Sequence, residues 1–203
     1  MERHYLITRS NPDDENFVDQ LEDVLDCLES ENLVFLYSET KNINDYIKIQ
    51  VWVEAREQGM VRLVDDYTVP ARYLIFGSSI VEDADKIMSQ IQSHLPIISL
   101  AELQEIAQNN MARDPKSLIQ LALGAGEKFN RNCFETLLSG LRHSDPEVRF
   151  AAVRGVGLSQ WSEFIPELKQ LNETENVREI QKLISKAIDA CMSRTVSEAC
   201  LMG

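Results

Sequence analysis

Residues 145–157 read DPEVRFAAVRGVG, and an earlier stretch of the chain repeats their pattern. That stretch, DPKSLIQLALGAG at residues 114–126, aligns with the later one without a gap at an offset of 31 residues. Both copies begin with Asp-Pro and end with Gly-X-Gly. A repeat of this kind indicates supersecondary units that stack on one another and bury a continuous core. The repeat therefore predicts a helical domain whose surface holds a partner.

Each copy reads as the first helix of a helical unit. Asp145 is a suitable N-cap residue, and Pro146 suits the first helical position, where its missing N–H is not needed. Small and apolar residues form the inward stripe, namely Val148, Ala151, Ala152 and Val156. Gly155 and Gly157 are expected to end the helix and open the turn. Further helices are expected at 130–142, 162–173 and 176–192.

Several positions within residues 111–193 carry a family resemblance. They are Asp145, Val148, Arg149, Ala152, Gly155 and the IPEL sequence at 165–168. This pattern resembles HEAT repeats of the short type found in phycobilin-lyase-like proteins, and the resemblance implies a concave face that binds another protein. Similar repeats also build alkylation-repair glycosylases and chromophore lyases, which gives a less favoured alternative. Because solenoids generally need three or more repeats, we expect the helix predicted at 100–108, or the N-terminal domain, to cap the first one.

The first 110 residues read as an α/β domain. Strands are expected at 4–8, 33–37, 61–64, 72–76 and 96–98, and helices at 15–29, 43–58, 81–93 and 100–108. In 43–58, alternating apolar residues are typical of a strand, but the length and the Asn44 or Asp45 cap favour a helix. Strands and helices that alternate in this way predict a parallel sheet in a three-layer fold. A flavodoxin-like or other doubly wound domain is the structural alternative.

Residues 31–108 also resemble a BRCT domain. The stretches that carry this resemblance are QGMVRLV at 58–64, ARYLIFG at 71–77 and DKIMSQIQSHLPIISLAELQEIA at 85–107. Members that read phosphopeptides have Ser or Thr followed by Gly after the first strand, and a Lys in the second helix. Here Tyr37 and Ser38 occupy the first place, which departs from that pattern, whereas Lys86 matches the second. The resemblance thus implies a phosphate site at Ser38 and Lys86, whereas the alternative is a surface lysine paired with neighbouring acids.

Charge is distributed unevenly along the chain. Residues 1–110 hold 21 acidic and 8 basic residues, whereas 111–203 hold 12 of each, which gives the net charge of -13 to the first part. A field this negative repels phosphate backbones and argues against broad nucleic-acid binding. One side of the helix expected at 15–29 carries acids that include Asp19, Glu22, Asp23 and Asp26. This side is either a solvated face or a docking surface for a basic partner.

The sequence predicts neither catalytic residues, nor a metal site, nor a cofactor. The histidines are isolated, and Asp65 with Asp66 at a strand end is better explained as a polar loop than as a metal site. The four cysteines, Cys27, Cys133, Cys191 and Cys200, are widely spaced, which is typical of reduced thiols in a cytosolic protein. Without an apolar span or a secretory leader, a cytoplasmic protein with no membrane association is expected.

These observations favour a non-enzymatic adaptor that binds a protein partner through its helical repeats and its acidic α/β domain. On the repeat side the candidate partner-binding residues are Arg149, Arg154 and Arg178. Their structural alternative is a set of ion pairs with Asp145 and Glu175. A second hypothesis makes the chain an immunity-type inhibitor that neutralises a basic enzyme by charge complementarity.

Overall fold

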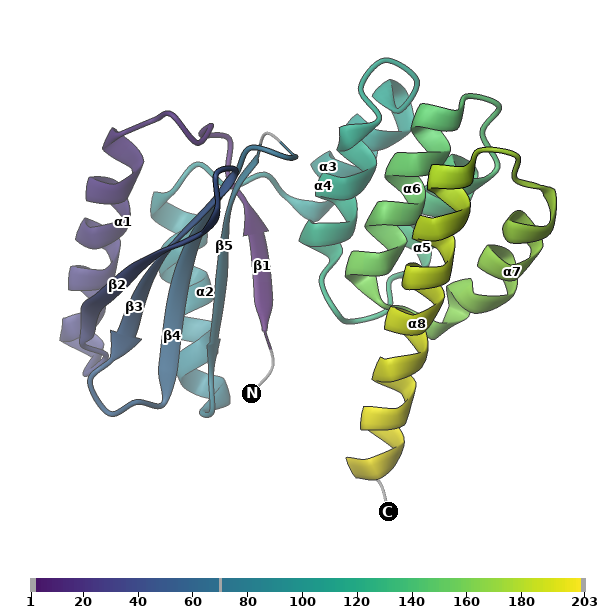
Figure 1. The fold of residues 1–203 in the computed structure, drawn as a ribbon. Helices are drawn as coiled ribbons and strands as arrows, with labels where there is room; N and C mark the ends of the chain where they lie inside the picture. Colours follow the sequence, from purple (N-terminus) through teal and green to yellow (C-terminus); the bar gives the residue numbers. More distant parts are fainter. Residues whose placement is uncertain (1–2, 70, 202–203) are drawn as a thin grey trace. The chain divides into compact units, whose positions relative to one another are not determined.

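The computed structural model describes residues 3–69 and 71–201, with side chains described as far as Ser193. The chain separates into two compact units, Met1–Ser99 and Leu100–Gly203. The first unit is mixed α/β and the second is helical, and Figure 1 follows the elements of both along the chain. The division comes before the domain boundary expected at residue 110, so the helix expected at 100–108 belongs to the helical unit.

The first unit contains a five-stranded sheet and two α-helices. Its elements are β1 (His4–Ile7), α1 (Asn16–Cys27), a 3-10 helix (Leu28–Glu31), β2 (Phe35–Asn44), β3 (Ile47–Glu54), β4 (Gly59–Asp66), β5 (Ala71–Ser78) and α2 (Val81–His94). The strand order is β1-β5-β4-β3-β2, and every neighbouring pair is antiparallel. β1 and β2 therefore form the two edges of the sheet.

The parallel sheet predicted for this part of the chain is wrong, and so is the doubly wound alternative. Short turns join β2 to β3, β3 to β4 and β4 to β5, and short turns are the connection that antiparallel neighbours use. The helix predicted over 43–58 is wrong as well, because β3 occupies 47–54 and its apolar residues alternate as in a strand. The strand predicted at 96–98 is reduced to one bridge between Thr8 and Ile97.

Both helices of the first unit cover the same face of the sheet. Phe17 and Leu21 of α1 share one buried cluster with Ile87 of α2. The sheet contributes inward-facing residues to this cluster, among them Trp52, Val61, Leu63, Leu74 and Phe76. Since Trp52 pairs with Val61, and Val61 with Phe76, these side chains stand in a row across three strands. One helical layer on one sheet face thus supplies the core of this unit.

A buried arginine holds the loop that leads into α1. Arg72 Nε lies 2.6 Å from Asp65 Oδ1, and the other guanidinium nitrogens donate to the carbonyl oxygens of Pro12 and Asp14. The guanidinium also lies over the ring of Phe17. These contacts hold the turn residues ahead of α1, which begins at Asn16, one residue after the predicted start of the helix.

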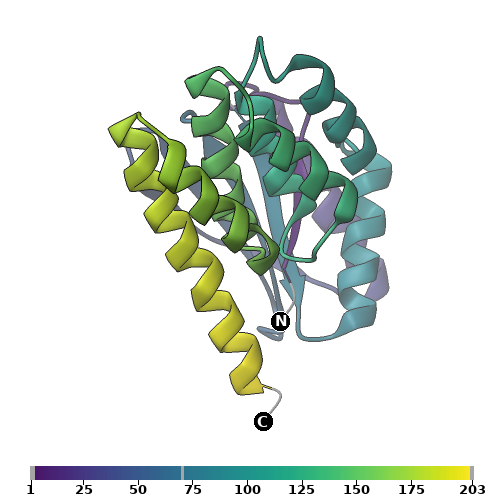
Figure 2. The same ribbon diagram turned by 90° about the vertical axis from the view of Figure 1, so that its right-hand side faces the viewer.

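The second unit consists of helices. They are α3 (Leu100–Asn110), α4 (Lys116–Ala125), α5 (Arg131–Leu141), α6 (Pro146–Ser159), a 3-10 helix (Ser162–Phe164), α7 (Ile165–Thr174) and α8 (Arg178–Leu201). α4 packs against α3 and α6, and α6 packs against α8. α5 packs against α4 and α6, whereas α7 packs against α8, the long yellow helix of Figure 2. The two sequence repeats therefore lie on the neighbouring helices α4 and α6.

α6 begins as the sequence predicts but ends later. Asp145 caps it, since its carboxylate accepts a hydrogen bond of 2.8 Å from the N–H of Glu147, and proline follows at the first helical position. The prediction that Gly155 and Gly157 end this helix is wrong, because α6 continues to Ser159 and ends where Gln160 takes a left-handed conformation. Gly155 instead lies buried in the contact with α4, where a Cβ atom would stand 3.1 Å from the carbonyl oxygen of Leu118.

Within the part of the chain that the structure describes, no helix combines the length and the apolar character that crossing a bilayer requires.

Candidate functional site

The helical unit contains a pocket that lies between the C-terminal end of α5 and α7. We call it the α5–α7 pocket. Its volume is about 510 Å³, within the range of about 300–1,000 Å³ that is usual for binding pockets. The residues that line it are Leu141, Arg142, Arg149, Glu167, Gln170, Leu171, Thr174, Glu175, Asn176 and Val177. They come from α5, α6, α7 and the turn into α8, so four segments of the repeat meet here.

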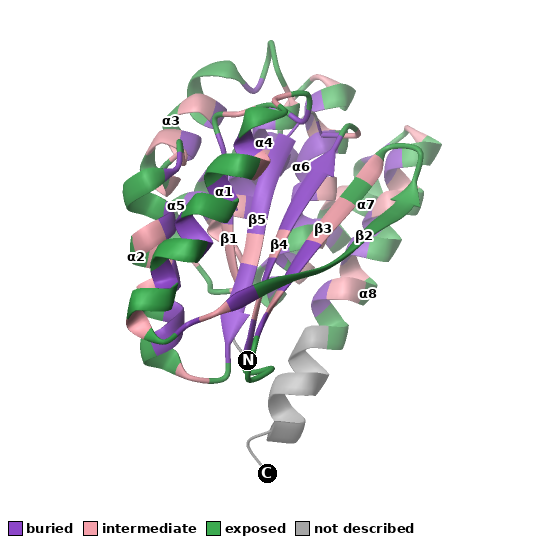
Figure 3. Ribbon diagram, turned by 90° about the vertical axis from the view of Figure 1, so that its left-hand side faces the viewer, coloured by how far each residue is buried: buried purple, intermediate pink, exposed green. Residues whose placement is uncertain are grey.

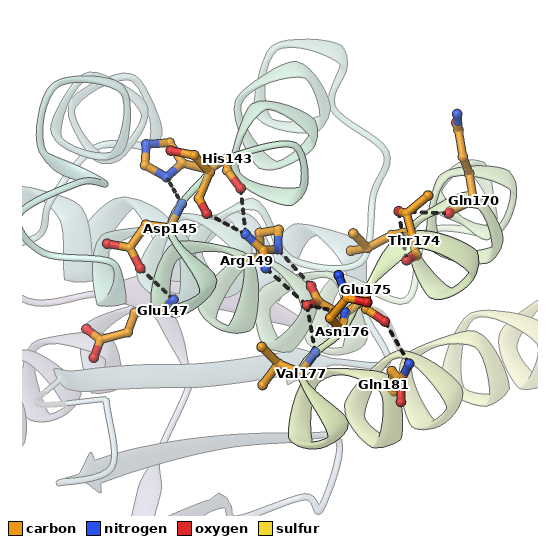
Figure 4. A network of polar contacts seen from close by, with 12 residues as sticks. His143, Asp145, Glu147, Arg149, Gln170, Thr174, Glu175, Asn176, Val177 and Gln181 are labelled. Atoms are coloured by element: carbon orange, nitrogen blue, oxygen red, sulfur yellow. Dashed lines mark hydrogen bonds and ion pairs between the residues drawn. The ribbon is translucent and has the colours of Figure 1, made fainter.

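An ion pair between Arg149 and Glu175 forms one wall of this pocket (Figure 4). Arg149 Nε lies 2.7 Å from Glu175 Oε2, and Nη2 lies 3.0 Å from Oε1, so the contact is bidentate. Nη1 donates to the carbonyl oxygens of His143 and Ser144, at 3.0 and 2.7 Å. The guanidinium thus joins α6, the turn before it and the turn before α8.

Glu175 is also the anchor for the start of α8. Its Oε1 accepts hydrogen bonds of 3.0 Å from the N–H groups of Asn176 and Val177, and its own carbonyl accepts one of 2.7 Å from Gln181. The hydrogen bonds from Arg149 hold the pKa of Glu175 below its ordinary value, although burial opposes them. The same hydrogen bonds raise the pKa of Arg149. Both groups are therefore charged throughout the neutral range, and they fix the walls of the pocket.

The rim of the pocket offers groups that remain accessible to a ligand. Arg142 Nη2 lies 2.9 Å from Glu167 Oε2, yet the arginine side chain is 63% exposed. The side chains of Gln170 and Asn176 are exposed, and Leu141 and Leu171 add apolar surface. Charged groups of both signs, amides and apolar carbons in one concave site suit a polypeptide segment better than a uniformly charged ligand.

The lining residues of the pocket do not include a nucleophile that is paired with a base. Thr174 supplies the one hydroxyl of the lining, and this hydroxyl donates to the carbonyl oxygens of Gln170 and Leu171 within its own helix. No His, Cys, Asp or Lys side chain belongs to the lining. The one hydroxyl of the lining is thus held within its own helix and has no base beside it among the lining residues.

The structure places one of the three predicted arginines in the α5–α7 pocket. Arg149 lies there, but its guanidinium is occupied by Glu175, which is the structural role that the sequence offers as an alternative. Arg154 is half-buried on α6, and Arg178 is exposed at the first position of α8, both outside the lining. The pocket residue Arg142 was not predicted, because neither the repeat nor any motif includes it.

The predicted acidic face of α1 lies on the surface of the first unit. Asp19, Glu22, Asp23 and Asp26 are all exposed, and Glu22 also accepts a hydrogen bond of 3.3 Å from the indole N–H of Trp52. The apolar side of α1 is buried, so the amphipathic spacing in the sequence correctly identifies which side faces water. No basic residue belongs to α1, so no ion pair within the helix offsets the charge of this acidic face.

The structure leaves Ser38 and Lys86 on separate elements of the first unit. Ser38 is exposed on β2 and Lys86 is half-buried on α2. Lys86 Nζ lies 3.9 Å from a carboxylate oxygen of Glu31 and 3.9 Å from one of Asp83. A phosphate that approached this ammonium would meet two carboxylates as well. The geometry agrees with the alternative of a lysine next to acids.

The remaining acidic and cysteine residues that the sequence analysis considers have structural roles where the structure describes them. Asp65 is buried against Arg72, and Asp66 accepts hydrogen bonds from the hydroxyl and the N–H of Thr68. Among the residues that the structure describes, no group of three or more His, Cys, Asp or Glu is placed to hold a metal ion. Burial raises the pKa of Cys133 to about 11, so its thiol stays protonated. The side chain of Cys200 lies outside the described residues.

Comparison with family models, with curated proteins and with solved structures found no match to this chain. What the pocket binds must therefore be inferred from its own residues.

Proposed function

We propose that this chain is a non-enzymatic interaction protein that binds a segment of a protein partner in the α5–α7 pocket. The observation that carries the proposal is a preformed pocket whose wall is fixed by the bidentate Arg149–Glu175 pair, while the rim keeps exposed donors and acceptors. A wall that is already rigid lowers the entropic cost of binding. The mixed chemistry of the lining fits a peptide with both polar and apolar side chains.

The first unit adds a second contact, which favours a partner with a basic surface. Residues 1–99 hold 19 acidic and 8 basic residues, a formal charge of -11, and α1 presents four of these acids together. Such a field attracts a positively charged protein and accelerates its association, and the effect weakens as salt rises. An inhibitor of a basic enzyme is one protein of this kind and remains the second candidate function, favoured by the same acidic face.

Photo-crosslinking tests the pocket directly. A photoreactive amino acid at Gln170, which is exposed and lines the pocket, should give a discrete covalent adduct with a partner in extracts of the native host. The same residue at Lys186, exposed on α8 and outside the pocket, is the matched control. Arg142→Glu should remove the Gln170 adduct, because it reverses the charge of the exposed rim cation without disturbing a buried group. An adduct at both positions, or at neither, would contradict the assignment of the pocket.

Salt dependence tests the acidic face separately. Replacing Asp19, Glu22, Asp23 and Asp26 by Asn or Gln should slow the association of the crosslinked partner and flatten its dependence on ionic strength. The dissociation rate should change less, because exposed charges act mainly on the encounter. If the substituted chain and the original associate equally fast at low salt, the acidic face has no part in binding.

A further inference from the structure

β2 is a long and exposed edge of the sheet. It stands at the end of the strand order, with β3 as its neighbour in the sheet. Nine of its ten residues are exposed, and Figure 3 accordingly shows almost all of the strand in green. A free edge presents a row of backbone N–H and C=O groups that can pair with a strand from another chain.

Large apolar side chains accompany this free backbone. Leu36 and Tyr37 near the start of β2 are 59% and 52% exposed, Ile43 near its end is 57% exposed, and Tyr46 in the following turn is 60% exposed. They account for four of the ten most exposed large hydrophobic residues among those that the structure describes. Apolar groups gathered along one strand edge are typical of an interaction surface rather than of scattered surface residues.

The middle of β2 is regular and carries one pair of opposite charges. The register with β3 shifts between Tyr37 and Glu39, and again between Asn42 and Asn44, whereas the four residues from 39 to 42 pair with β3 without interruption. Within this regular stretch, Lys41 Nζ lies 2.6 Å from Glu39 Oε1. The two side chains stand on the same face of the strand, since they are two residues apart, and both are about half exposed.

This stretch is complementary to itself when two copies run antiparallel. Antiparallel strands related by a two-fold axis place one residue opposite its own equivalent. If that residue is Thr40, Glu39 of each copy stands opposite Lys41 of the other. The arrangement thus matches opposite charges on both sides of the two-fold axis, and such cross-strand pairs stabilise a sheet.

Lysine on an edge strand normally opposes pairing, because an approaching strand buries its charge. In the register centred on Thr40, each Lys41 meets a carboxylate of the other copy, so the lysine does not oppose pairing with a second copy. It still opposes pairing with strands that lack a carboxylate at this position. The bulges at either end of the regular stretch limit pairing to its central residues. The edge therefore favours some partner strands over others, and a second copy of β2 supplies the complementary charges.

We propose that β2 pairs antiparallel with β2 of a second copy of this chain, with the two-fold axis at Thr40, so that two five-stranded sheets join into one. This dimer uses the first unit and is independent of the α5–α7 pocket. Its failure would consequently leave the proposed binding function untouched, and the dimer would persist if the pocket bound nothing.

Charge reversal tests the pairing. Sedimentation of the full chain should show a monomer–dimer equilibrium that shifts with concentration. Glu39→Lys places like charges opposite each other across the two-fold axis, and Lys41→Glu does the same, so each variant alone should be monomeric. Mixed together they should form a heterodimer, because each Lys then meets a Glu of the other chain. Both variants lose the ion pair between residues 39 and 41 of their own strand. Dimer formation that returns only in the mixture therefore reports a contact between the two chains.

Cysteine crosslinking tests the register. In a background with Cys27 and Cys200 replaced by Ser, Thr40→Cys should give a disulfide-linked dimer on mild oxidation, since residues opposite each other have Cα atoms about 4.5–5.5 Å apart. Asn42→Cys is the matched control, because in this register its two copies lie about 13 Å apart. A full chain that sediments as a monomer at all concentrations, or two cysteine variants that crosslink equally, would overturn the proposal.

Discussion

Among single residues, Glu175 both pairs with Arg149 and holds the start of α8. Its carboxylate is 1% exposed, accepts two hydrogen bonds from Arg149 and caps the start of α8. Replacing it with Gln leaves the guanidinium without its counter-ion in a site that is mostly shielded from water. We expect Glu175→Gln to lower the free energy of unfolding of this unit by about 3 kcal/mol. Urea unfolding followed by Trp161 fluorescence, in a Trp52→Phe background, measures this change.

The Arg142–Glu167 pair provides a matched control for the same chemistry. Its closest contact, 2.9 Å, is similar to those of the buried pair, but its side chains are 63% and 26% exposed. We expect Glu167→Gln to change the free energy of unfolding by less than about 1 kcal/mol, because exposed ion pairs contribute little. Equal losses for the Glu167 and Glu175 variants would show that burial does not set the strength of these pairs.

The lowered pKa of Glu175 also predicts a dependence on pH. The unfolded chain takes up a proton on this group at a higher pH than the folded chain does, so protons favour unfolding. The stabilisation that Glu175 provides is present at neutral pH, and it should decline as the pH falls below about 4.5. Other acids also titrate in this range, so the quantity to measure is the difference in unfolding free energy between the original chain and Glu175→Gln. This difference should shrink on acidification, whereas a constant difference would contradict the assigned ion pair.

The sequence identifies Arg149 and Glu175 as a candidate pair but does not decide between pairing and partner binding. The two residues are 26 positions apart, and only the packing of α6 against α8 brings them together. Arg142 was missed for a related reason. It follows the last residue of α5 and belongs to no periodic pattern, and its place on the pocket rim depends on where α7 lies.

Among the helices and strands, α6 contains two glycines that should respond oppositely to the same substitution. At Gly155 a Cβ atom would lie 3.1 Å from the carbonyl oxygen of Leu118 and 3.2 Å from Ala122 Cβ, whereas at Gly157 the nearest atom, Ala187 Cβ, is 3.6 Å away. Alanine is preferred over glycine within helices by about 1 kcal/mol. We therefore expect Gly157→Ala to raise the unfolding free energy by about that amount, and Gly155→Ala to lower it because α4 must move. Thermal unfolding followed by circular dichroism measures both, and stabilisation by both would show that the α4–α6 contact yields easily.

These glycines also explain why the predicted end of α6 is wrong. A Gly-X-Gly sequence after an apolar stripe is typical of a helix end, and in the first copy Gly126 does end α4 with a positive φ of 65°. In the second copy the same residue type permits close packing instead. The helix predicted over 43–58 is wrong for a similar reason, because the length of this stretch is typical of a helix whereas its alternating apolar residues are typical of a strand. Local patterns identify that an element exists, but tertiary contacts decide between its possible roles.

For the molecule as a whole, the sequence predicts the two-part organisation better than the topology of either part. The repeat correctly places a helical unit in the C-terminal half, since its two copies form the adjacent helices α4 and α6. The direction of the strands was predicted wrongly, because antiparallel and parallel sheets can share the same apolar strands. The short turns between β2 and β5 distinguish an antiparallel sheet from a parallel one. A helix over 43–58 hides these turns, because β3 then has no place between β2 and β4.

The first residue of the helical unit, at the start of α3, determines which fragments should fold. α3 packs on α4 and α5 and buries Leu103 and Ala107, and Gln108 Nε2 donates a hydrogen bond of 3.1 Å to Thr136 Oγ1. A fragment of residues 100–203 should therefore unfold in one cooperative transition when heated. A fragment of residues 111–203 exposes the surface that α3 covers, and its Tm should be lower by about 10 °C or more.

A point substitution separates the packing of α3 from the length of the fragment. Leu103→Ala in residues 100–203 removes apolar contacts and keeps the helix, and it should cost about 3 kcal/mol, as truncation of a buried leucine does. Circular dichroism melts of the three samples compare them directly, with sedimentation to confirm that each is monomeric. If residues 111–203 alone give a cooperative, monomeric transition at the same Tm as residues 100–203, α3 does not cap the first repeat, and the repeats form a stable unit by themselves.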